Sequence, residues 1–429
     1  MDLEKELNRV NIIFFYALYP WFPLWAFISV YFIKLPFNKV LVLPAICLTI
    51  LILVFKENKR LPAYLFFLFL FNIYHIAESF YFDTIPGNTN KIFYILSNYL
   101  FLASLLLFIV ENTKFDYKFI KRQNKYIFII IILALCVSLV QTQVKNFFFS
   151  PEILNYKVLM NENRIPSIFS WYDPNTLGIT FPLIVSIAIS GIRKEENLKL
   201  FAIIMSVIIV AFLTKTRYVM LSSIIVLSQI FFSTELPKSL KVKYLLTIII
   251  SVLIAFTVAK AIHIDIQQTI DERILEKDTK MASANARIDS YYIFILKFPE
   301  YPWFGVGPKT RYDVIRLLKG VPLIHVGYLS YLYWYGIVGA SLLFISIFLF
   351  IRKLYRAGKD FGFWGGFYGL LAFVVANTTM VYFNLSEMGI IISAIYLKFY
   401  NDKPGLKYLH LLKRYNLLEY TSFSQKKGD

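Results

Sequence analysis

Long, nearly uninterrupted runs of apolar residues are the feature that most restricts the fold of this chain. Of its 429 residues, 58% are hydrophobic and 18% are aromatic, whereas a soluble domain averages roughly 45–50% apolar residues. A hydrocarbon core about 30 Å thick takes roughly 17–25 residues of helix. Twelve runs have this character, although several are slightly short. They cover residues 11–33, 40–55, 62–82, 93–110, 126–140, 174–192, 198–213, 218–232, 244–262, 326–351, 361–383 and 388–399.

These runs predict an all-α polytopic integral membrane protein with about 12 transmembrane helices. In lipid every backbone polar group must be satisfied internally, so only helices and closed barrels can span. A barrel would need alternating strands of roughly ten residues, which this pattern does not contain. The first run is too long for a cleavable signal and lacks a small-residue cleavage site, so we expect it to remain as an anchor.

The distribution of Lys and Arg predicts the orientation of these helices. With twelve spans and both termini on one side, that side collects 27 of the 45 basic residues. Loops on the cytoplasmic side carry the excess of positive charge, so we expect both termini in the cytoplasm. The net charge of +18 would favour nucleic-acid binding in a soluble protein. Here it follows mostly from membrane topology, and no nucleic-acid partner is expected.

The longest polar interruption separates the ninth and tenth runs and divides the chain into four parts. The expected parts are transmembrane helices 1–9 (residues 1–262), an extracytoplasmic loop with short amphipathic helices (residues 263–325), transmembrane helices 10–12 (residues 326–400) and a basic cytoplasmic tail (residues 401–429). We find no internal repeat of 20–50 residues and no low-complexity block. The chain is therefore expected to be one membrane bundle with two external segments longer than a turn, roughly residues 141–173 and the longer loop over residues 263–325.

The loop over residues 263–325 is rich in basic residues on the side where such residues are otherwise scarce. It carries Arg273, Arg287, Arg311 and Arg316. Loops of this length without a span of their own are uncommon and usually functional. We therefore expect this face of the protein to handle an anionic ligand.

Two amphipathic helices are expected inside this loop. Ile266, Ile270 and Ile274 recur every four residues, which predicts a helix lying at the membrane interface. A second short helix is expected over residues 309–319, where three basic residues share one face. A stripe of this kind is also typical of a face that is merely solvated or turned to lipid headgroups.

Two outward arginines are candidates for an anion clamp. Lys215 and Arg217 stand in a predicted hairpin between two short runs, where both could simply snorkel to the interface. Alternatively, Arg217 begins a helix, whose dipole favours negative charge, and its guanidinium can grip phosphate oxygens in pairs. Arg287 shares a helical face with Tyr291, although a local contact with Asp289 would be a purely structural role of little energetic weight.

Two turns border the apolar runs. Asp173 and Pro174 fit the cap and first turn of a helix. Capping explains that pair but not Asn175, which is a candidate for binding.

Residues 302–307, Pro-Trp-Phe-Gly-Val-Gly, predict a tight turn. A glycine pair without a complete phosphate-binding motif is weak evidence for nucleotide binding.

Histidine supplies the clearest candidate for acid–base chemistry. His325 stands where the loop enters the tenth run, and an imidazole placed there can take a proton from a hydroxyl. The structural alternative is an amphipathic ring satisfied at the interface. His75 and Glu78 lie one turn apart inside the third run. Ionisable groups in hydrocarbon are costly and often functional, although these two could simply bond each other.

Neither cysteine suggests a disulfide or a metal site. Cys47 and Cys136 both lie inside apolar runs, far apart and without CxxC spacing, so we expect them to be core residues. No outward cluster of Asp or His offers metal ligands. The sequence therefore predicts chemistry without a metal or another cofactor.

In this order, six fragments resemble the bacterial O-antigen polymerase (Wzy-type) and O-antigen ligase superfamily. The similarity covers residues 163–339. A long loop between the ninth and tenth of twelve spans, in a GT-C-like arrangement, also resembles that family. The family usually has Asn after the histidine and Ser before the hairpin arginine, where this chain has Val326 and Thr216. The fragments are Asp-Pro-Asn175, Thr-x-Thr-Arg217, Arg287, the turn over residues 302–307, His325-x-x-Tyr-Leu329 and Tyr335-Gly-Ile-Val-Gly339.

The resemblance implies metal-independent glycosyl transfer on the extracytoplasmic face of the bacterial inner membrane. The donor would be an oligosaccharide on undecaprenyl pyrophosphate. A polymerase would build O-antigen or capsular polysaccharide from such repeat units, with a chain-length regulator and a flippase as partners, whereas a ligase would use lipid A core as acceptor. The resemblance assigns catalysis to His325, Arg287 and Arg217, and substrate binding to Arg311, Arg164, Tyr328, Asn175 and Lys215.

Two other classes of protein remain open at this stage. A lipid-oligosaccharide flippase or other transporter can also have twelve spans. It would line a cavity along several spans with cations, often in two related halves, whereas this chain concentrates its outward charge in one loop. A non-enzymatic assembly partner would use the loop as a docking surface. Likeness at the level of fold does not by itself decide between these functions.

Overall fold

The computed structural model of the chain describes most of the expected bundle. It describes residues 3–33, 37–81, 98–143, 177–192, 196–214, 217–232, 238–261, 282–307, 324, 326–378, 385–403 and 405–407. Within these residues all regular structure is helical, and no strand occurs. The predicted all-helical fold is confirmed for this part of the chain.

The helices follow one another with short connections wherever the chain is described. The first half contains α1 (Leu3–Leu18), α2 (Phe22–Ile28), the π-helical turn η1 (Ser29–Ile33), α3 (Phe37–Phe55), α4 (Ala63–Tyr81), α6 (Tyr99–Glu111), α7 (Tyr117–Gln143), α9 (Leu177–Gly191) and α10 (Asn197–Thr214). The second half contains α11 (Arg217–Phe232), α12 (Lys238–Ala261), α14 (Ala282–Lys297), the 3-10 turn η2 (Phe298–Glu300), α16 (Gly327–Phe361), α17 (Trp364–Ala376) and α18 (Met388–Asn401).

Each expected apolar run coincides at least in part with one of these helices. Within the described part of the chain, four helices are long and apolar enough to cross a membrane, or five if the pair α1 and α2 is one span bent by 72°. Pro20 and Pro23 explain that bend, because proline lacks the N–H that would continue the helix. Six further apolar helices are shorter, at 10–17 residues. The protein is therefore a helical membrane protein, while the number of twelve spans stays a prediction.

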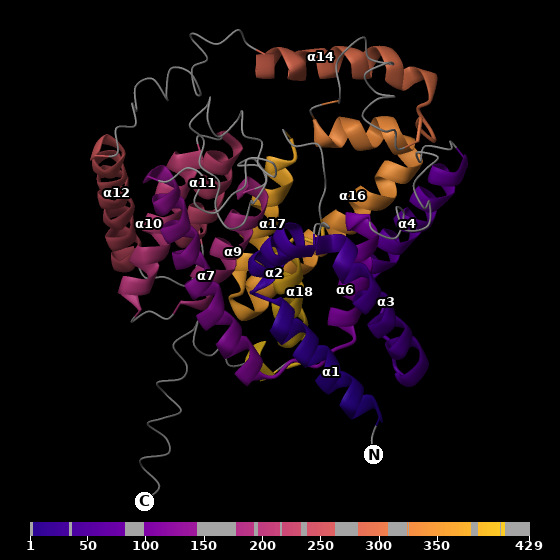
Figure 1. The fold of residues 1–429 in the computed structure, drawn as a ribbon, viewed down its shortest axis with the longest axis horizontal. Helices are drawn as coiled ribbons and strands as arrows, with labels where there is room; N and C mark the ends of the chain where they lie inside the picture. The colour runs from indigo at the N-terminus through magenta and orange to yellow at the C-terminus, as the bar shows by residue number, and fades with distance from the viewer. Residues whose placement is uncertain are drawn as a thin grey trace, which may run out of the picture.

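The helices run between two opposite faces of the bundle (Figure 1). We call one of them the basic face. It carries Lys56, Arg60 and Lys114, and an ion pair of 2.7 Å between Arg60 Nη1 and Asp402 Oδ1 joins the residues before α4 to those after α18 there. We call the other the loop face, because α14 lies across it (Figure 1).

A polar network joins three central helices. The hydroxyl of Ser186 on α9 donates to Gln229 Oε1 on α11 over 2.7 Å, and Gln229 Nε2 donates to Ser190 Oγ over 2.7 Å. Ser190 Oγ also accepts from the backbone N–H of Gly365 at the start of α17, at 2.6 Å. A Cβ at Gly365 would lie 2.4 Å from the Ser186 carbonyl oxygen, so only glycine permits this approach. Small residues and interhelical hydrogen bonds are the usual means of holding membrane helices together.

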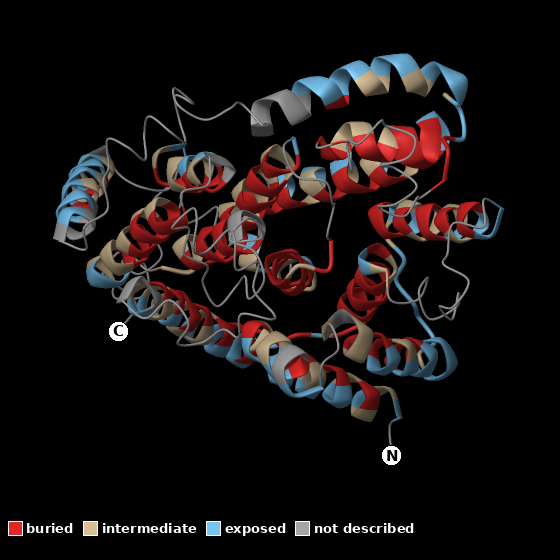
Figure 2. Cartoon of the chain, turned by 45° about the horizontal axis from the view of Figure 1, so that its top comes forward, coloured by how far each residue is buried: buried red, intermediate tan, exposed pale blue. Residues whose placement is uncertain are grey.

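The outer surface of the bundle is apolar as well as its core. Figure 2 shows buried residues concentrated in the central helices, whereas α12 and α14 expose much of their surface. Phe32, Leu43 and Phe348 are 75%, 66% and 62% exposed. Such a surface is stable against hydrocarbon but not against water. It is the surface expected of a bundle surrounded by lipid.

The prediction that both cysteines are core residues is wrong. Cys47 on α3 and Cys136 on α7 are free and exposed. In a membrane bundle the residues that face lipid are as apolar as those that face other helices. The position of a residue inside an apolar run therefore does not show whether its side chain faces lipid or another helix.

Candidate functional site

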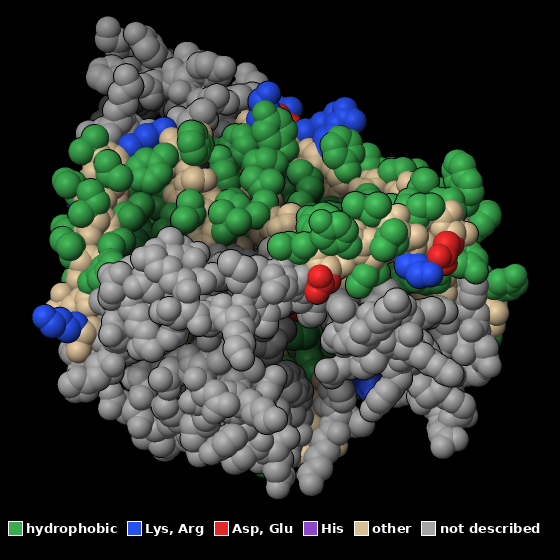
Figure 3. Space-filling model, turned by 90° about the horizontal axis from the view of Figure 1, so that it is seen from above, with side chains coloured by type: hydrophobic (Ala, Val, Ile, Leu, Met, Phe, Trp, Pro, Cys, Tyr) green, Lys and Arg blue, Asp and Glu red, His purple; other side chains and the backbone are tan. Residues whose placement is uncertain are grey.

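The helix α14 lies on the loop face with an apolar stripe turned outward. Ile288, Tyr291, Tyr292, Ile295 and Leu296 are all exposed and recur at helical spacing. The opposite side packs on the bundle through Ile293 and Phe294. Figure 3 looks down on this face and shows hydrophobic side chains gathered along its described part. An amphipathic helix with this exposed stripe is typical of the membrane interface.

The helix α16 is broken at Gly336, which has φ 61° and ψ −172°. In Figure 1 the part of α16 before the break runs beneath α14, and the part after it descends beside α4. In an unbroken helix the N–H groups of Ile337 and Val338 would donate to the carbonyls of Tyr333 and Trp334. The break frees all four groups. Buried backbone groups at such a break must find other partners.

The turn over residues 302–307 supplies those partners. The Ile337 N–H donates to the Pro302 carbonyl over 2.8 Å, and the Val338 N–H donates to the Trp303 carbonyl over 3.1 Å. In return, the Val306 N–H donates to the Tyr333 carbonyl at 3.1 Å, and the Gly307 N–H donates to the Trp334 carbonyl at 2.9 Å. The turn is thus hydrogen-bonded into the broken helix. The predicted turn is confirmed, and two of the fragments that carry the resemblance meet here.

Glycine is required on both sides of this contact. A Cβ at Gly305 would lie 2.4 Å from the Trp334 carbonyl oxygen, and one at Gly336 would lie 2.3 Å from the Trp303 carbonyl oxygen. Both glycines also have positive φ, of 76° and 61°. Larger residues would separate the two backbones.

His75 and Tyr74 on α4 support the break from below. The Tyr74 hydroxyl lies 2.9 Å from the Phe304 carbonyl oxygen and 3.1 Å from that of Tyr335. His75 is buried, with Nδ1 2.9 Å from the Tyr335 hydroxyl and Nε2 3.0 Å from Asn98 Nδ2. These contacts tie the turn, α4, α6 and α16 into one framework.

The hydrogen-bond network assigns the proton of this imidazole. Asn98 Oδ1 accepts from the Leu100 N–H at 2.8 Å, so the amide group turns its N–H toward His75 Nε2. A neutral His75 then carries its proton on Nδ1 and donates it to the Tyr335 hydroxyl. His75 therefore bonds residues on α6 and α16 rather than Glu78. The neighbour of Glu78 is Tyr74, and Glu78 Oε2 is buried without a hydrogen-bond partner among the described residues.

A second cluster forms around the end of α17. The Gly327 N–H donates to the Asn377 carbonyl at 3.2 Å, and the Tyr328 hydroxyl donates to the Val374 carbonyl at 2.6 Å. The Ser330 hydroxyl donates to the Ile324 carbonyl at 2.6 Å. The chain is therefore anchored on both sides of position 325, beside the last turn of α17.

The same end of α17 also contacts the start of α11. Only two residues separate the end of α10 at Thr214 from the start of α11 at Arg217, so the predicted hairpin is confirmed. Val219, in the first turn of α11, packs against Ala376 at the end of α17. The helix start at Arg217 and the start of α16 therefore both border the end of α17, on the loop face.

The predicted site residues are described to different extents. Arg217 and Arg287 are placed only by their backbone, at the first residue of α11 and in the second turn of α14. Tyr328 is fully described, half-buried, and engaged with Val374. The remaining predicted residues lie outside the described residues: His325, Arg311, Arg164, Asn175 and Lys215.

The sequence analysis missed a carboxylate on the loop face. Glu387 precedes α18 at its N-cap position, and the Thr180 hydroxyl on α9 donates to its carboxylate. An acidic residue directly before an apolar run was the available signal. The supporting role of Asn98 was also missed, because nothing in the sequence pairs it with His75. Among the described residues, no three His, Cys, Asp or Glu side chains gather around a possible metal position.

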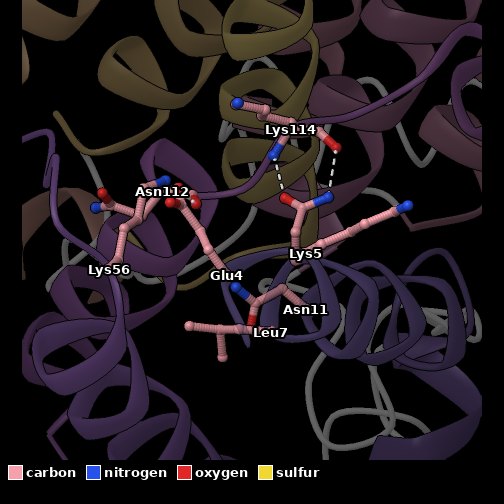
Figure 4. A pocket seen from close by; sticks show the side chains of 8 residues that line it. Glu4, Lys5, Leu7, Asn11, Lys56, Asn112 and Lys114 are labelled. Carbon is pink, nitrogen blue, oxygen red and sulfur yellow. Dashed lines mark hydrogen bonds between the residues drawn. The ribbon is translucent and has the colours of Figure 1, made fainter. Parts of the chain in front are cut away.

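A hollow of about 260 Å³ lies on the opposite, basic face, away from the predicted site (Figure 4). There Lys56 Nζ donates to the Asn112 carbonyl at 2.6 Å, and burial lowers the pKa of this lysine. The Asn8 side chain bonds the backbone of Lys114 twice, at 2.7 and 3.3 Å. These contacts join α1 to the ends of α3 and α6, which is a structural role.

A comparison with protein families matches part of the chain to one family model. Residues 200–344, about a third of the chain, match the family model described as O-Antigen ligase. The matched segment runs from α10 into α16 and includes Arg217, Arg287, Arg311 and His325. The resemblance to the O-antigen polymerase and ligase superfamily is thereby confirmed. No curated protein matches the chain.

Proposed function

We propose, on the premise that this chain is a protein of the O-antigen polymerase and ligase superfamily, that it is a glycosyltransferase acting on lipid-linked glycans. The observation that carries the proposal is the family match over residues 200–344, which supports an O-antigen polymerase or ligase. The more specific proposal is a polymerase of undecaprenyl-pyrophosphate-linked repeat units. No observation favours a flippase.

In the proposed reaction a hydroxyl of the acceptor sugar attacks the anomeric carbon of the donor glycan. A bond forms between that oxygen and the anomeric carbon, and the bond from the anomeric carbon to the pyrophosphate oxygen breaks. Polyprenyl pyrophosphate leaves with the bonding electron pair. Direct displacement inverts the configuration at the anomeric carbon. His325 takes the hydroxyl proton, a task suited to an imidazole near neutral pH.

The negative charge that develops on the leaving pyrophosphate needs stabilisation. We assign it to Arg217 and Arg287, with Arg311 as a further phosphate contact. The position of Arg217 at the first residue of α11 supports this role, because unsatisfied N–H groups and the helix dipole favour an anion there. Guanidinium groups bind phosphate oxygens in pairs and stay charged, so they stabilise the leaving group without a proton transfer.

The lipid part of the donor is assigned to the exposed face of α14. This helix carries Arg287 and presents Ile288, Tyr292 and Leu296 to the outside. An apolar stripe next to a phosphate-binding arginine suits a ligand that is a polyprenyl chain at one end and a pyrophosphate at the other. The aromatic residues would rest at the level of the headgroups.

Purified protein reconstituted in lipid with lipid-linked repeat units alone tests the polymerase proposal. We expect a ladder of glycans that lengthens with time. Transfer that occurs only after lipid A core is added would replace the polymerase by the ligase. No transfer in either mixture, with correctly inserted protein, would refute glycosyl transfer altogether.

Single substitutions test the assigned residues. Arg217→Ala and Arg287→Ala are each expected to reduce product by at least 100-fold, since removing one preorganised charge-stabilising group typically costs about 10²–10³ in rate. Arg352→Ala, an exposed arginine at the other end of α16, is the matched control and should retain activity. Wild-type product levels in either arginine variant would remove that residue from the site. Labelling that places Arg217 and Arg287 in the cytoplasm would refute the proposed topology.

A further inference from the structure

A larger hollow opens on the basic face, between α7, α9, α10 and α18. Its volume is about 980 Å³. We call it the basic groove. These helices are neighbours in the bundle, with α9 in contact with each of the other three (Figure 1). The groove lies at the opposite ends of the helices from the candidate site on the loop face. Its charged lining consists of Lys118, Lys121, Arg122, Lys125, Glu196 and Lys199.

The charge of the groove is strongly positive. Among the described residues that line it, five of the six ionised side chains are basic, and the one carboxylate, on Glu196, is already paired with Lys199. Lys118, Lys121 and Lys125 are exposed and make no ion pair with any described residue. Arg122 lies over the Tyr16 ring, 5.7 Å from its centroid. The groove therefore has unneutralised positive charge available for an anion.

This arrangement of charge is unfavourable in the absence of an anion. The four cations of α7 stand at positions 118, 121, 122 and 125, which share one face of the helix. Like charges at this spacing destabilise a helix. Lys118 also lies in the first turn, where the positive end of the helix dipole disfavours cations. The Asp116 carboxylate, which accepts from the Phe119 N–H at 2.7 Å, offsets this dipole only in part. A bound anion would reduce the remaining repulsion between these cations.

Beyond the cations the groove is lined by apolar side chains. Phe128 and Ile129 follow one turn further along α7, in the direction of the loop face, and Ile203 lies opposite on α10. Along the helix axes, the cations lie at the basic face and the apolar side chains lie deeper in the bundle. This order matches an amphiphile whose headgroup lies at the membrane surface and whose chains extend into the membrane.

The walls of the groove are held in place by hydrogen bonds between helices. The Tyr396 hydroxyl on α18 donates to Asn124 Oδ1 on α7 at 2.6 Å. Ser190 on α9 accepts from Gln229 and from the backbone of Gly365. The groove is thus preformed, so that binding does not have to order its walls.

We propose that the basic groove binds the headgroup of an anionic phospholipid, of the phosphatidylglycerol or cardiolipin class, from the leaflet at the basic face. Basic pockets between transmembrane helices are suited to such headgroups. The C-terminal segment of the chain itself is a less suitable occupant. Residues 408–429 contain four Lys and Arg against two acidic residues, so their charge has the same sign as the groove.

Native mass spectrometry of the purified full-length protein, titrated with phosphatidylglycerol or with phosphatidylcholine, tests this proposal. The wild type should retain phosphatidylglycerol in clear preference to phosphatidylcholine. Because each basic residue near the surface contributes about 1 kcal/mol, the triple variant Lys118→Gln, Lys121→Gln, Lys125→Gln should bind it roughly 100-fold more weakly.

Two further variants separate a specific site from a general effect of charge. The control Lys59→Gln, Arg352→Gln, Arg356→Gln removes the same charge from exposed positions outside the groove and should bind like the wild type. The variant Lys118→Arg, Lys121→Arg, Lys125→Arg keeps the charge and should also retain the lipid. If the glutamine variant does not fold, the arginine variant and the control still test the proposal against phosphatidylcholine.

Three results would overturn the proposal. Equal retention of phosphatidylglycerol by the glutamine variant would show that the groove is not the site. If the control variant lost phosphatidylglycerol binding to the same extent, the net charge of the protein and not the groove would explain the binding. Displacement of the lipid by inorganic phosphate at millimolar concentration would show that the groove binds free phosphate instead.

Discussion

Replacing Gly336 by alanine should release the turn over residues 302–307 from the broken helix α16. The backbone at Gly336, with φ 61° and ψ −172°, is in a region that is essentially restricted to glycine. An added Cβ would lie 2.3 Å from the Trp303 carbonyl oxygen and 2.5 Å from the Phe304 nitrogen. Both are backbone atoms, so the contact can be relieved only by moving the turn.

The size of the effect follows from two opposing quantities. Backbone strain in this region costs about 1–3 kcal/mol, and relief of the steric contact adds to it. Against this, four backbone hydrogen bonds hold the turn in place, and each contributes about 1 kcal/mol net. The strain alone therefore cancels a large part of the free energy that holds the turn against α16. The population of the undocked turn should increase by roughly 5- to 150-fold.

Hydrogen–deuterium exchange of the purified protein measures this population directly. The amides of Val306 and Gly307, which donate to α16 in the wild type, should exchange faster by the same factor. Gly362→Ala is the matched control, because Gly362 also has positive φ, of 75°, but ends α16 at the basic face. It should leave exchange in the turn unchanged. Unaltered exchange at Val306 and Gly307 in the Gly336 variant would refute the reasoning.

Three further substitutions test other contacts. Tyr335→Phe removes the hydroxyl that bonds His75 and should lower the free energy of unfolding by about 1–3 kcal/mol; an unchanged thermal midpoint would contradict this. Gln229→Leu breaks both side-chain bonds to α9 and should cost roughly 1–3 kcal/mol in the same assay, so unchanged unfolding would contradict a role for these bonds. Thr180→Val removes one partner of Glu387; glycan transfer should fall severalfold if this carboxylate supports the site, while protein yield stays constant.

The positions of the helices were the most predictable part of the structure. Every expected apolar run coincides with a helix, and the hairpin between Thr214 and Arg217 occurs where it was expected. The prediction succeeds because backbone groups in hydrocarbon have almost no alternative to helical hydrogen bonds. The break at Gly336 was not predicted. It depends on a distant turn that supplies the missing partners, and no local pattern reports that turn.

The burial of individual residues was much less predictable. Cys47 and Cys136 were expected in the core and are exposed. In water, burial follows polarity, but in lipid both sides of a helix can be apolar. The hydrogen-bond partners of His75 could not be predicted from the sequence either, because Asn98 and Tyr335 are 23 and 260 residues away from it.

The local secondary structure around two of the predicted site residues was predictable, whereas their roles stay predictions. Arg217 begins a helix and Arg287 lies within one, as expected. The sequence did not indicate that the start of α11 and the start of α16 both border the end of α17. The one signal for Glu387, an acidic residue directly before an apolar run, is by itself indistinguishable from an ordinary helix cap.

The order of apolar runs by itself determined that this chain is a helical membrane protein, because backbone groups in hydrocarbon have almost no alternative to helical hydrogen bonds. Only the tertiary structure decided that the turn over residues 302–307 completes the hydrogen bonds of a broken α16, and that the cations of α7 border a groove. Both depend on contacts between segments far apart in the chain. Such contacts depend on how distant helices pack against each other, and the sequence pattern of a single segment does not predict that packing.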